Sequence, residues 1–203
     1  DSLKQYITNY KVTPQEAIEA VITVARGELG YLEKASNSNL DSKKGNAGNN
    51  NYTKYWRDLM PEGQGWAWCA CFVSWVLKQA FGEATARAML GLDDFPYIKV
   101  DNMRQERPND LSTTPQVGDI VVYWSDDKGE YSHTGIVVAT DGVNFTTIEG
   151  NTGPAAGVVD EGHGVYEKYY DIYSDKKPRF VHLDYSLVTT INSGGAGENP
   201  YPV

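Results

Sequence analysis

Two residues of this chain, Cys69 and His133, have side chains and sequence surroundings suited to nucleophilic catalysis. Cys69 lies at the start of a run with helical apolar spacing, and His133 opens a run of strand character, SHTGIVVAT. A cysteine at a helix N-terminus has its thiolate stabilised by the helix dipole and by unpaired backbone N–H groups. A nearby histidine can take the thiol proton and later protonate a leaving amine. The pair therefore predicts acyl transfer with Cys69 as nucleophile and His133 as base.

The competing interpretation of Cys69 is that it fills the core, because free cysteine is among the most buried residue types. For a lone helical cysteine this would be the better explanation, and only a catalytic partner reverses the preference. Cys69 and Cys71 are the two cysteines of the chain. Residues two apart point away from each other on a helix, so we expect no disulfide between them.

A polar partner for His133 is available on the next expected strand, which ends in Glu149-Gly150-Asn151. Which of these side chains can reach the imidazole depends on the register of the hairpin, because a one-residue shift moves a side chain to the other face. A two-residue turn would place His133 opposite Gly150 and turn Glu149 to the other face.

A turn of three or five residues gives the alternative register. In it His133 lies opposite Asn151, and Glu149 is its diagonal neighbour on the same face. This register also pairs Ile136 with Ile148, apolar with apolar, and we adopt it for that reason. Glu149 or Asn151 can then accept the imidazole N–H and fix the tautomer and orientation of His133.

The elements that must position Cys69 are helical. Thr13-Pro14-Gln15-Glu16 is typical of a capping box with proline at the first helical position, and the helix it starts should stop at Gly30. The Asn-rich stretch over residues 36–51 predicts a long loop. Residues 69–80 have apolar positions at helical spacing, which predicts a central helix with Cys69 in its first turn and Gly82 as its end.

The pattern around these elements predicts the rest of an α+β fold. Short helices are expected over residues 52–59, 85–90 and 100–107. From Pro115 the period changes to that of strands, which we expect over residues 120–124, 133–139, 145–149, 165–170 and 179–183. A chain in which helices come first and an antiparallel sheet follows has an α+β arrangement, and we expect the N-terminal helices to pack on the sheet.

Composition excludes several classes of partner. The 18 Lys and Arg against 27 Asp and Glu give a net charge of −9, and no local basic patch is visible, so we expect neither nucleic acid nor an anionic membrane surface as partner. No apolar run approaches the roughly 20 residues that span a bilayer. The opening residues, DSLKQYITNY, lack the basic and apolar segments of a signal peptide.

Four blocks of the sequence, in order, resemble the CHAP domain, the Cys/His-dependent amidohydrolase/peptidase of bacterial and phage cell-wall lysins. They are WAWCACFVSW, PQVGDIVVYW, SHTGIVV and TTIEGNT. The resemblance implies a papain-like fold of the NlpC/papain-like superfamily. It implies Cys69 as nucleophile, His133 as base, and Glu149 and Asn151 as polar partners of the histidine. The chain departs from the family at Cys71, commonly a small residue, and lacks the acidic calcium loop found before the cysteine in some phage members.

The resemblance implies a peptidoglycan hydrolase that cuts an amide bond, either an N-acetylmuramoyl-L-alanine amidase or an endopeptidase of the peptide or cross-bridge. It implies a CHAP-like catalytic domain over residues 1–185, a linker or tail over 186–203, and a monomer joined to further wall-binding domains. The expected location is extracellular or in the cell wall, whether the protein is secreted by a bacterium or phage-encoded. Two alternatives remain: a non-catalytic wall-binding module on the same fold, and an amidase for a small amide of the glutathionylspermidine type.

Several other residues have a functional and a structural interpretation. Trp66 and Trp68 are candidates for substrate binding, with packing around the helix start as the alternative, which we favour for Trp68. Asp41, among asparagines, is a candidate calcium ligand, but it lacks the alternating acidic positions of a dedicated loop, so we expect no metal and no other cofactor. Asp119 is expected to serve its turn, and His163 and His182 to be solvated.

Overall fold

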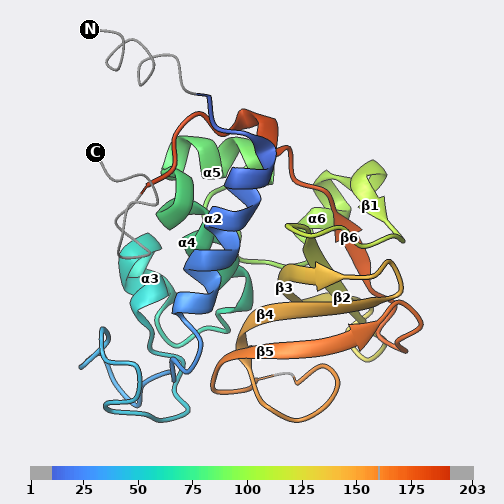
Figure 1. Ribbon diagram of the computed structural model, residues 1–203. Coiled ribbons are helices and arrows are strands. Elements are labelled where there is room, and N and C mark those ends of the chain that lie inside the picture. Colours follow the sequence, from blue (N-terminus) through green and yellow to red (C-terminus); the bar gives the residue numbers. More distant parts are fainter. Residues whose placement is uncertain (1–10, 160, 193–203) are drawn as a thin grey trace, which may run out of the picture.

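The computed structural model describes residues 11–159 and 161–192, with helices on one side of the molecule and strands on the other (Figure 1). The helices are α2 (Pro14–Gly27), α3 (Lys54–Leu59), α4 (Cys69–Phe81), α5 (Glu83–Leu90) and α6 (Asn102–Glu106), with 3-10 helices η1 (Pro61–Gly63), η2 (Pro108–Asp110) and η3 (Tyr185–Leu187). The strands are β1 (Leu111–Ser112), β2 (Ile120–Ser125), β3 (Glu130–Thr140), β4 (Asn144–Thr152), β5 (Gly164–Asp171) and β6 (Arg179–Val181). The predicted α+β class, with N-terminal helices packed on an antiparallel sheet, is confirmed.

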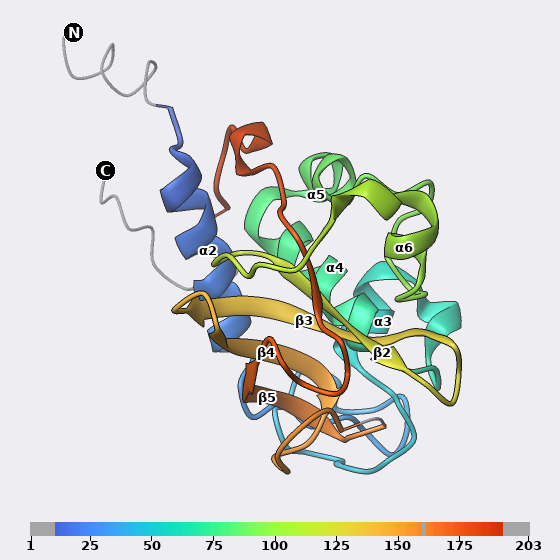
Figure 2. The same ribbon diagram turned by 90° about the vertical axis from the view of Figure 1, so that its right-hand side faces the viewer.

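The strands form one antiparallel sheet in the order β1-β6-β2-β3-β4-β5. Figure 2 shows β3, β4 and β5 following one another across this sheet. The five predicted strands are present with shifted ends. The largest shifts are those of β3, which begins three residues earlier than predicted, and of β4, which ends three residues later. The sequence did not predict β1, because two residues are too few to show a period.

The central helix α4 is buried on all sides. Each of its residues from Cys69 to Leu77 is buried, because α4 packs on β3 and β4 and is covered elsewhere by α2, α3 and α5. A helix enclosed in this way is apolar around its whole circumference. Gly150 lets β4 approach the helix, since a Cβ there would come within 2.7 Å of Phe72 Cβ. Gly82, with φ of 86°, ends the helix as predicted.

Helix α2 begins with the predicted capping box. The Thr13 side chain accepts from the N–H of Glu16, and the Glu16 side chain accepts from the N–H of Thr13. The helix ends at Gly27, one turn before the predicted stop. Its buried residues, among them Val21 and Ala25, join the core cluster around α4, which anchors the helix layer on one side of the sheet.

The other side of the sheet carries a second, smaller apolar cluster. Its buried members are Val121, Tyr123, Val137, Phe145 and Phe180. They alternate along the strands with residues of the main core, as the two-residue period of a strand requires. The central strands are therefore buried on both faces, and polar side chains that share the second face lie in a dry environment.

The predicted loop over residues 36–51 is held by its own hydrogen bonds. Lys34 forms isolated bridges with Ala47 and Tyr52, and its Nζ donates to the carbonyls of Ser42 and Lys43. A buried ammonium with carbonyl acceptors stabilises the path of a loop that has no helix or strand of its own.

After β6 the chain returns to the helices. Val188 is buried in the main core, and the N–H of Asn192 donates to Ala80 O at 2.8 Å. Residues 193–203, most of the predicted tail, lie outside the described residues.

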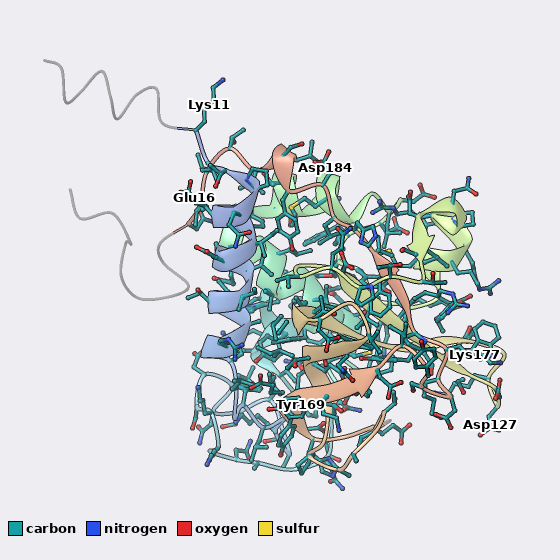
Figure 3. All side chains as sticks on the ribbon, turned by 45° about the vertical axis from the view of Figure 1, so that its right-hand side comes forward. Lys11, Glu16, Asp127, Tyr169, Lys177 and Asp184 are labelled. Atoms are coloured by element: carbon teal, nitrogen blue, oxygen red, sulfur yellow. The ribbon has the colours of Figure 1, made fainter. Side chains whose placement is uncertain are left out.

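At the opposite edge Lys177 Nζ lies 3.3 Å from Asp126, where Figure 3 shows Lys177 and Asp127 at the rim of the sheet. None of the helices that the structure describes is long and apolar enough to cross a membrane.

Candidate active site

Cys69 is the first residue of α4. The first hydrogen bond of the helix joins the N–H of Phe72 to Trp68 O at 2.9 Å, so the N–H groups of the first turn precede the hydrogen-bond ladder. Trp68, the N-cap residue, places no side-chain cap on them. The Cys69 side chain is thus at the positive end of the helix dipole, where a thiolate is favoured. The residue is 5% exposed, which leaves a small opening to the solvent.

His133 comes to Cys69 from β3. The residue is 2% exposed, and Cys69 is one of the neighbours that raise the pKa of its imidazole. His133 pairs with Tyr123 of β2, whereas the next residue of β2, Trp124, pairs with Tyr131. Ser132 is therefore an extra residue in β3. Such a bulge adds twist and re-aims the neighbouring side chain, here the imidazole.

Glu149 completes the constellation from β4. Its Oε1 lies 2.8 Å from His133 Nε2, and the carboxylate is fully buried. The ladder pairs Ile136 with Ile148, so Glu149 takes the diagonal position of the adopted register. The turn alone does not produce this register. Thr140 pairs with Phe145, and Val138 is an extra residue in β3.

The charges of the three groups support one another. Burial acts to lower the pKa of His133, but the charge of Glu149 and the hydrogen bonds with Cys69 and Glu149 raise it to about 10. Burial acts to raise the pKa of Glu149, but the His133 charge and its hydrogen bonds hold it below its usual value. A carboxylate only accepts hydrogen bonds, so Nε2 carries a proton and Nδ1 is the atom left for the sulfur. The arrangement favours an imidazolium beside a buried carboxylate.

The site lies in a stretch that is similar to a known family. Residues 61–151 match the family model of the CHAP domain. This stretch runs from η1 to the end region of β4 and includes Cys69, His133, Glu149 and Asn151. The match confirms the CHAP resemblance of the sequence. CHAP domains are generally hydrolases, so the match supports amidase or peptidase activity on peptidoglycan as a class.

Two other comparisons add less. A solved structure described as "The crystal structure of Ly7917" has 18% sequence identity and a TM-score of 0.44, over 84% of this chain and 62% of that chain. The present chain thus spans under two thirds of that one. A search of curated proteins found no match.

Asn151, the fourth catalytic residue expected of the CHAP stretch, lies apart from the hydrogen-bonded set. It is 3% exposed and has a left-handed φ of 55°, and the ladder with β5 shifts register between Glu149 and Thr152. Within residues 11–159 and 161–192 its side chain makes no hydrogen bond with His133. Of the two candidate orienting groups, the structure brings Glu149 to the imidazole.

The two tryptophans expected at the substrate differ in placement. Trp66 is 52% exposed and packs edge-on against Trp56. Trp68 is fully buried, stacks on Tyr55 and donates from Nε1 to Glu33 Oε1 at 3.3 Å. Trp68 was a candidate for substrate binding with packing favoured, and its buried ring takes the packing role at the helix start.

The remaining candidates lie away from the catalytic set. The Asp41 carboxylate accepts a hydrogen bond from Arg57 at 2.7 Å, so it has a partner within the protein. Among the described residues no group of three or more His, Cys, Asp and Glu could hold a metal. Asp119 accepts from the N–H of Gln116 in its turn at 2.6 Å, and its Oδ1 also lies 2.8 Å from His182 Nδ1, a hydrogen-bonded pair that sequence reasoning missed.

Sequence reasoning also missed the hydroxyl groups around Glu149. Tyr123 and Thr147 donate to Oε2 at 2.8 and 2.6 Å, and Tyr170 donates to Oε1 at 3.1 Å. A signal for one of them was present, since Thr147 lies two residues before Glu149 and must share its face of the strand. The two tyrosines come from β2 and β5, the strands on either side of the β3–β4 pair, and this sheet order does not follow from the pattern of the sequence.

Gly135 provides a test of this geometry. An added Cβ there would overlap Cγ of Glu149, so Gly135→Ala is expected to displace the carboxylate. We expect a loss of about 100-fold in the rate of wall hydrolysis, the scale of a misplaced catalytic group, and about 1–3 kcal/mol of stability. The measurements are initial rates and thermal unfolding.

Gly27→Ala is the matched control for that variant. A Cβ at Gly27 meets nothing within 4 Å, so this substitution should leave activity unchanged. If Gly135→Ala retains the parent rate, Glu149 is not held by contact with the strand opposite.

Proposed function

We propose that this chain is a peptidoglycan hydrolase that cuts an amide bond through an acyl intermediate on Cys69. The observation that supports it is the buried pair in which His133 Nε2 lies 2.8 Å from Glu149 Oε1, with Cys69 at the start of α4 among the neighbours that raise the pKa of His133. Nucleophile, base and orienting carboxylate in this order are what acyl transfer needs. The CHAP match over residues 61–151 supports the substrate class.

The reaction follows from the proton positions. The Cys69 thiolate attacks the carbonyl carbon of the amide, and the imidazolium of His133 gives its proton to the leaving amine as the C–N bond breaks. The neutral imidazole then takes a proton from water, and the resulting hydroxide attacks the thioester. The C–S bond breaks, the carboxylic acid leaves, and the thiolate and imidazolium are restored. Glu149 keeps its charge throughout and stabilises the imidazolium.

The helix start supplies a donor for the developing oxyanion. The backbone N–H of Cys69 lies at the positive end of α4, before the first hydrogen bond of the helix. A donor fixed at the position where charge develops stabilises the transition state. Trp66 lies three residues before the nucleophile and is half exposed, so we propose it as an aromatic contact for the sugar or stem peptide.

The proposal includes the setting of the enzyme. We infer an extracellular or cell-wall location, since peptidoglycan is found there, and a monomer that works on the polymer alone or joined to wall-binding domains. The bond is that between sugar and stem peptide or one within the peptide or cross-bridge. No step of the mechanism passes through a metal or cofactor.

The test is mass analysis of the fragments released from a defined Gram-positive wall. Under reducing conditions we expect new amino groups without new reducing ends, and fragment masses that identify the bond. Protein alkylated with iodoacetamide is the control and should release nothing. Walls that stay intact would contradict the proposal. Binding to walls without cleavage would instead indicate a wall-binding module, and cleavage of a glutathione–polyamine conjugate alone a small-amide amidase.

A further inference from the structure

The Glu149 carboxylate has more donors than an orienting group requires. Oε1 accepts from His133 at 2.8 Å and from Tyr170 at 3.1 Å. Oε2 accepts from Tyr123 at 2.8 Å and from Thr147 at 2.6 Å. Four donors on a fully buried carboxylate satisfy both oxygens and hold the group in one orientation.

Tyr123 differs from the other two hydroxyl donors because it contacts both members of the His–Glu pair. Its ring stacks on the His133 ring, with centroids 5.8 Å apart and planes inclined by 22°. The same side chain donates to Glu149 from its hydroxyl. Tyr123 is also the cross-strand neighbour of His133 and is 1% exposed. Thr147 and Tyr170 contact Glu149 without stacking on His133.

We propose that Tyr123 is a positioning residue for the reaction: its ring sets the plane of the His133 imidazole, and its hydroxyl keeps Glu149 charged and directed at Nε2. This inference rests on the proposed function and deepens it, since it names a residue that acts through the catalytic pair without touching the substrate.

The surroundings of the pair allow the effect of Tyr123 to be predicted. The titratable groups facing His133 and Glu149 are Cys69 from α4, Tyr123 from β2, and Tyr170 and Lys168 from β5. Burial and the Glu149 charge raise the pKa of Tyr123 well above its usual value, so its hydroxyl remains a donor. Without that donor the Glu149 carboxylate is no longer held directed at Nε2, and an imidazolium whose counter-charge is displaced loses its proton at lower pH.

Tyr123→Phe separates the two contacts, because it keeps the ring and removes the hydroxyl. The chain has three histidines, so NMR of protein labelled with ¹⁵N-histidine follows His133 directly, assigned by loss of its signals in His133→Gln. We expect the titration midpoint of His133 to fall by about one pH unit, the scale of one hydrogen bond to a charged group. The alkaline limb of the wall-hydrolysis rate should move down by the same amount.

Tyr185→Phe is the matched control. The Tyr185 hydroxyl is also buried and donates to Gly118 O at 2.6 Å, away from the catalytic pair. Both variants should lose similar thermal stability, but Tyr185→Phe should leave the His133 midpoint unchanged. A midpoint in Tyr123→Phe equal to that of the parent, or an equal shift in Tyr185→Phe, would overturn the proposal. Because the titration needs no substrate, it gives an answer even if the protein hydrolyses no wall.

Discussion

Replacing Cys69 with alanine is expected to abolish hydrolysis of cell walls. Without the sulfur no acyl intermediate forms, and His133 and Glu149 lose the group they act upon. Removal of a nucleophile from such a set lowers the rate by at least about 10⁴-fold. The measurement is the initial release of amino groups from purified walls. Cys69→Ala protein that lyses walls as fast as the parent would falsify the mechanism.

Cys71→Ala is the matched control, two residues further along the same helix. Burial, with the neighbouring Cys69 and Asp58 charges, raises the pKa of Cys71 well above its usual value, and the residue is 1% exposed. It therefore stays a protonated thiol, and its replacement should leave the rate within about threefold of the parent. Iodoacetamide should add one group to the parent, at Cys69, and none to Cys69→Ala.

The second large effect is expected at Glu149, where two substitutions separate charge from shape. Glu149→Gln keeps an acceptor for Nε2, and the hydroxyls of Tyr123 and Thr147 can rotate to accept from its amide. The imidazolium loses its stabilising charge, so we expect the rate to fall by roughly 10²- to 10³-fold. With the Glu149 charge gone, burial lowers the pKa of His133, and the alkaline limb of the rate should move to lower pH. Rates measured from pH 6 to about pH 10 test both expectations.

Glu149→Ala should in addition lose about 3–5 kcal/mol of stability, because it leaves a buried charge and three hydroxyls without their partner. The folded pKa of His133 is raised, so its contribution is complete below the unfolded pKa and is lost as pH rises toward about 10. The folded pKa of Glu149 is lowered, so its contribution is present above its unfolded pKa and is lost as pH falls. The stability difference between parent and variant should thus be greatest between about pH 4.5 and 6.5, above the unfolded pKa of Glu149 and below that of His133. A difference that does not vary with pH would show that the pair is not ionised.

The sequence predicted the parts of the site that depend on local pattern. Cys69 at a helix start follows from apolar spacing and from Gly82 downstream. The diagonal placement of Glu149 follows from the Ile136–Ile148 pair, because the side-chain period of a strand is two. These inferences need only one element or one hairpin, and the structure agrees with both.

What the sequence could not predict depends on contacts between distant elements. Tyr123 and Tyr170 reach Glu149 from strands on either side of the β3–β4 hairpin, and periodicity does not give sheet order. The sequence left Trp68 with both a packing and a substrate-binding role, because the direction of its ring is set by Glu33 and Tyr55, which lie far from it along the chain. Asn151 was expected at the imidazole, but the register shift after Glu149 could not be seen in the pattern.

The bulges beside the catalytic pair have a consequence for engineering. One extra residue, Ser132, lies just before His133, and another lies in the stretch between Glu149 and Thr152. The first extra residue lies between His133 and the loop over residues 126–129. The second lies between Glu149 and the residues that follow β4, of which 153–159 are described. Irregular ladders absorb local changes of path, so we expect loops grafted at these two places to alter which substrates fit while leaving the chemistry intact.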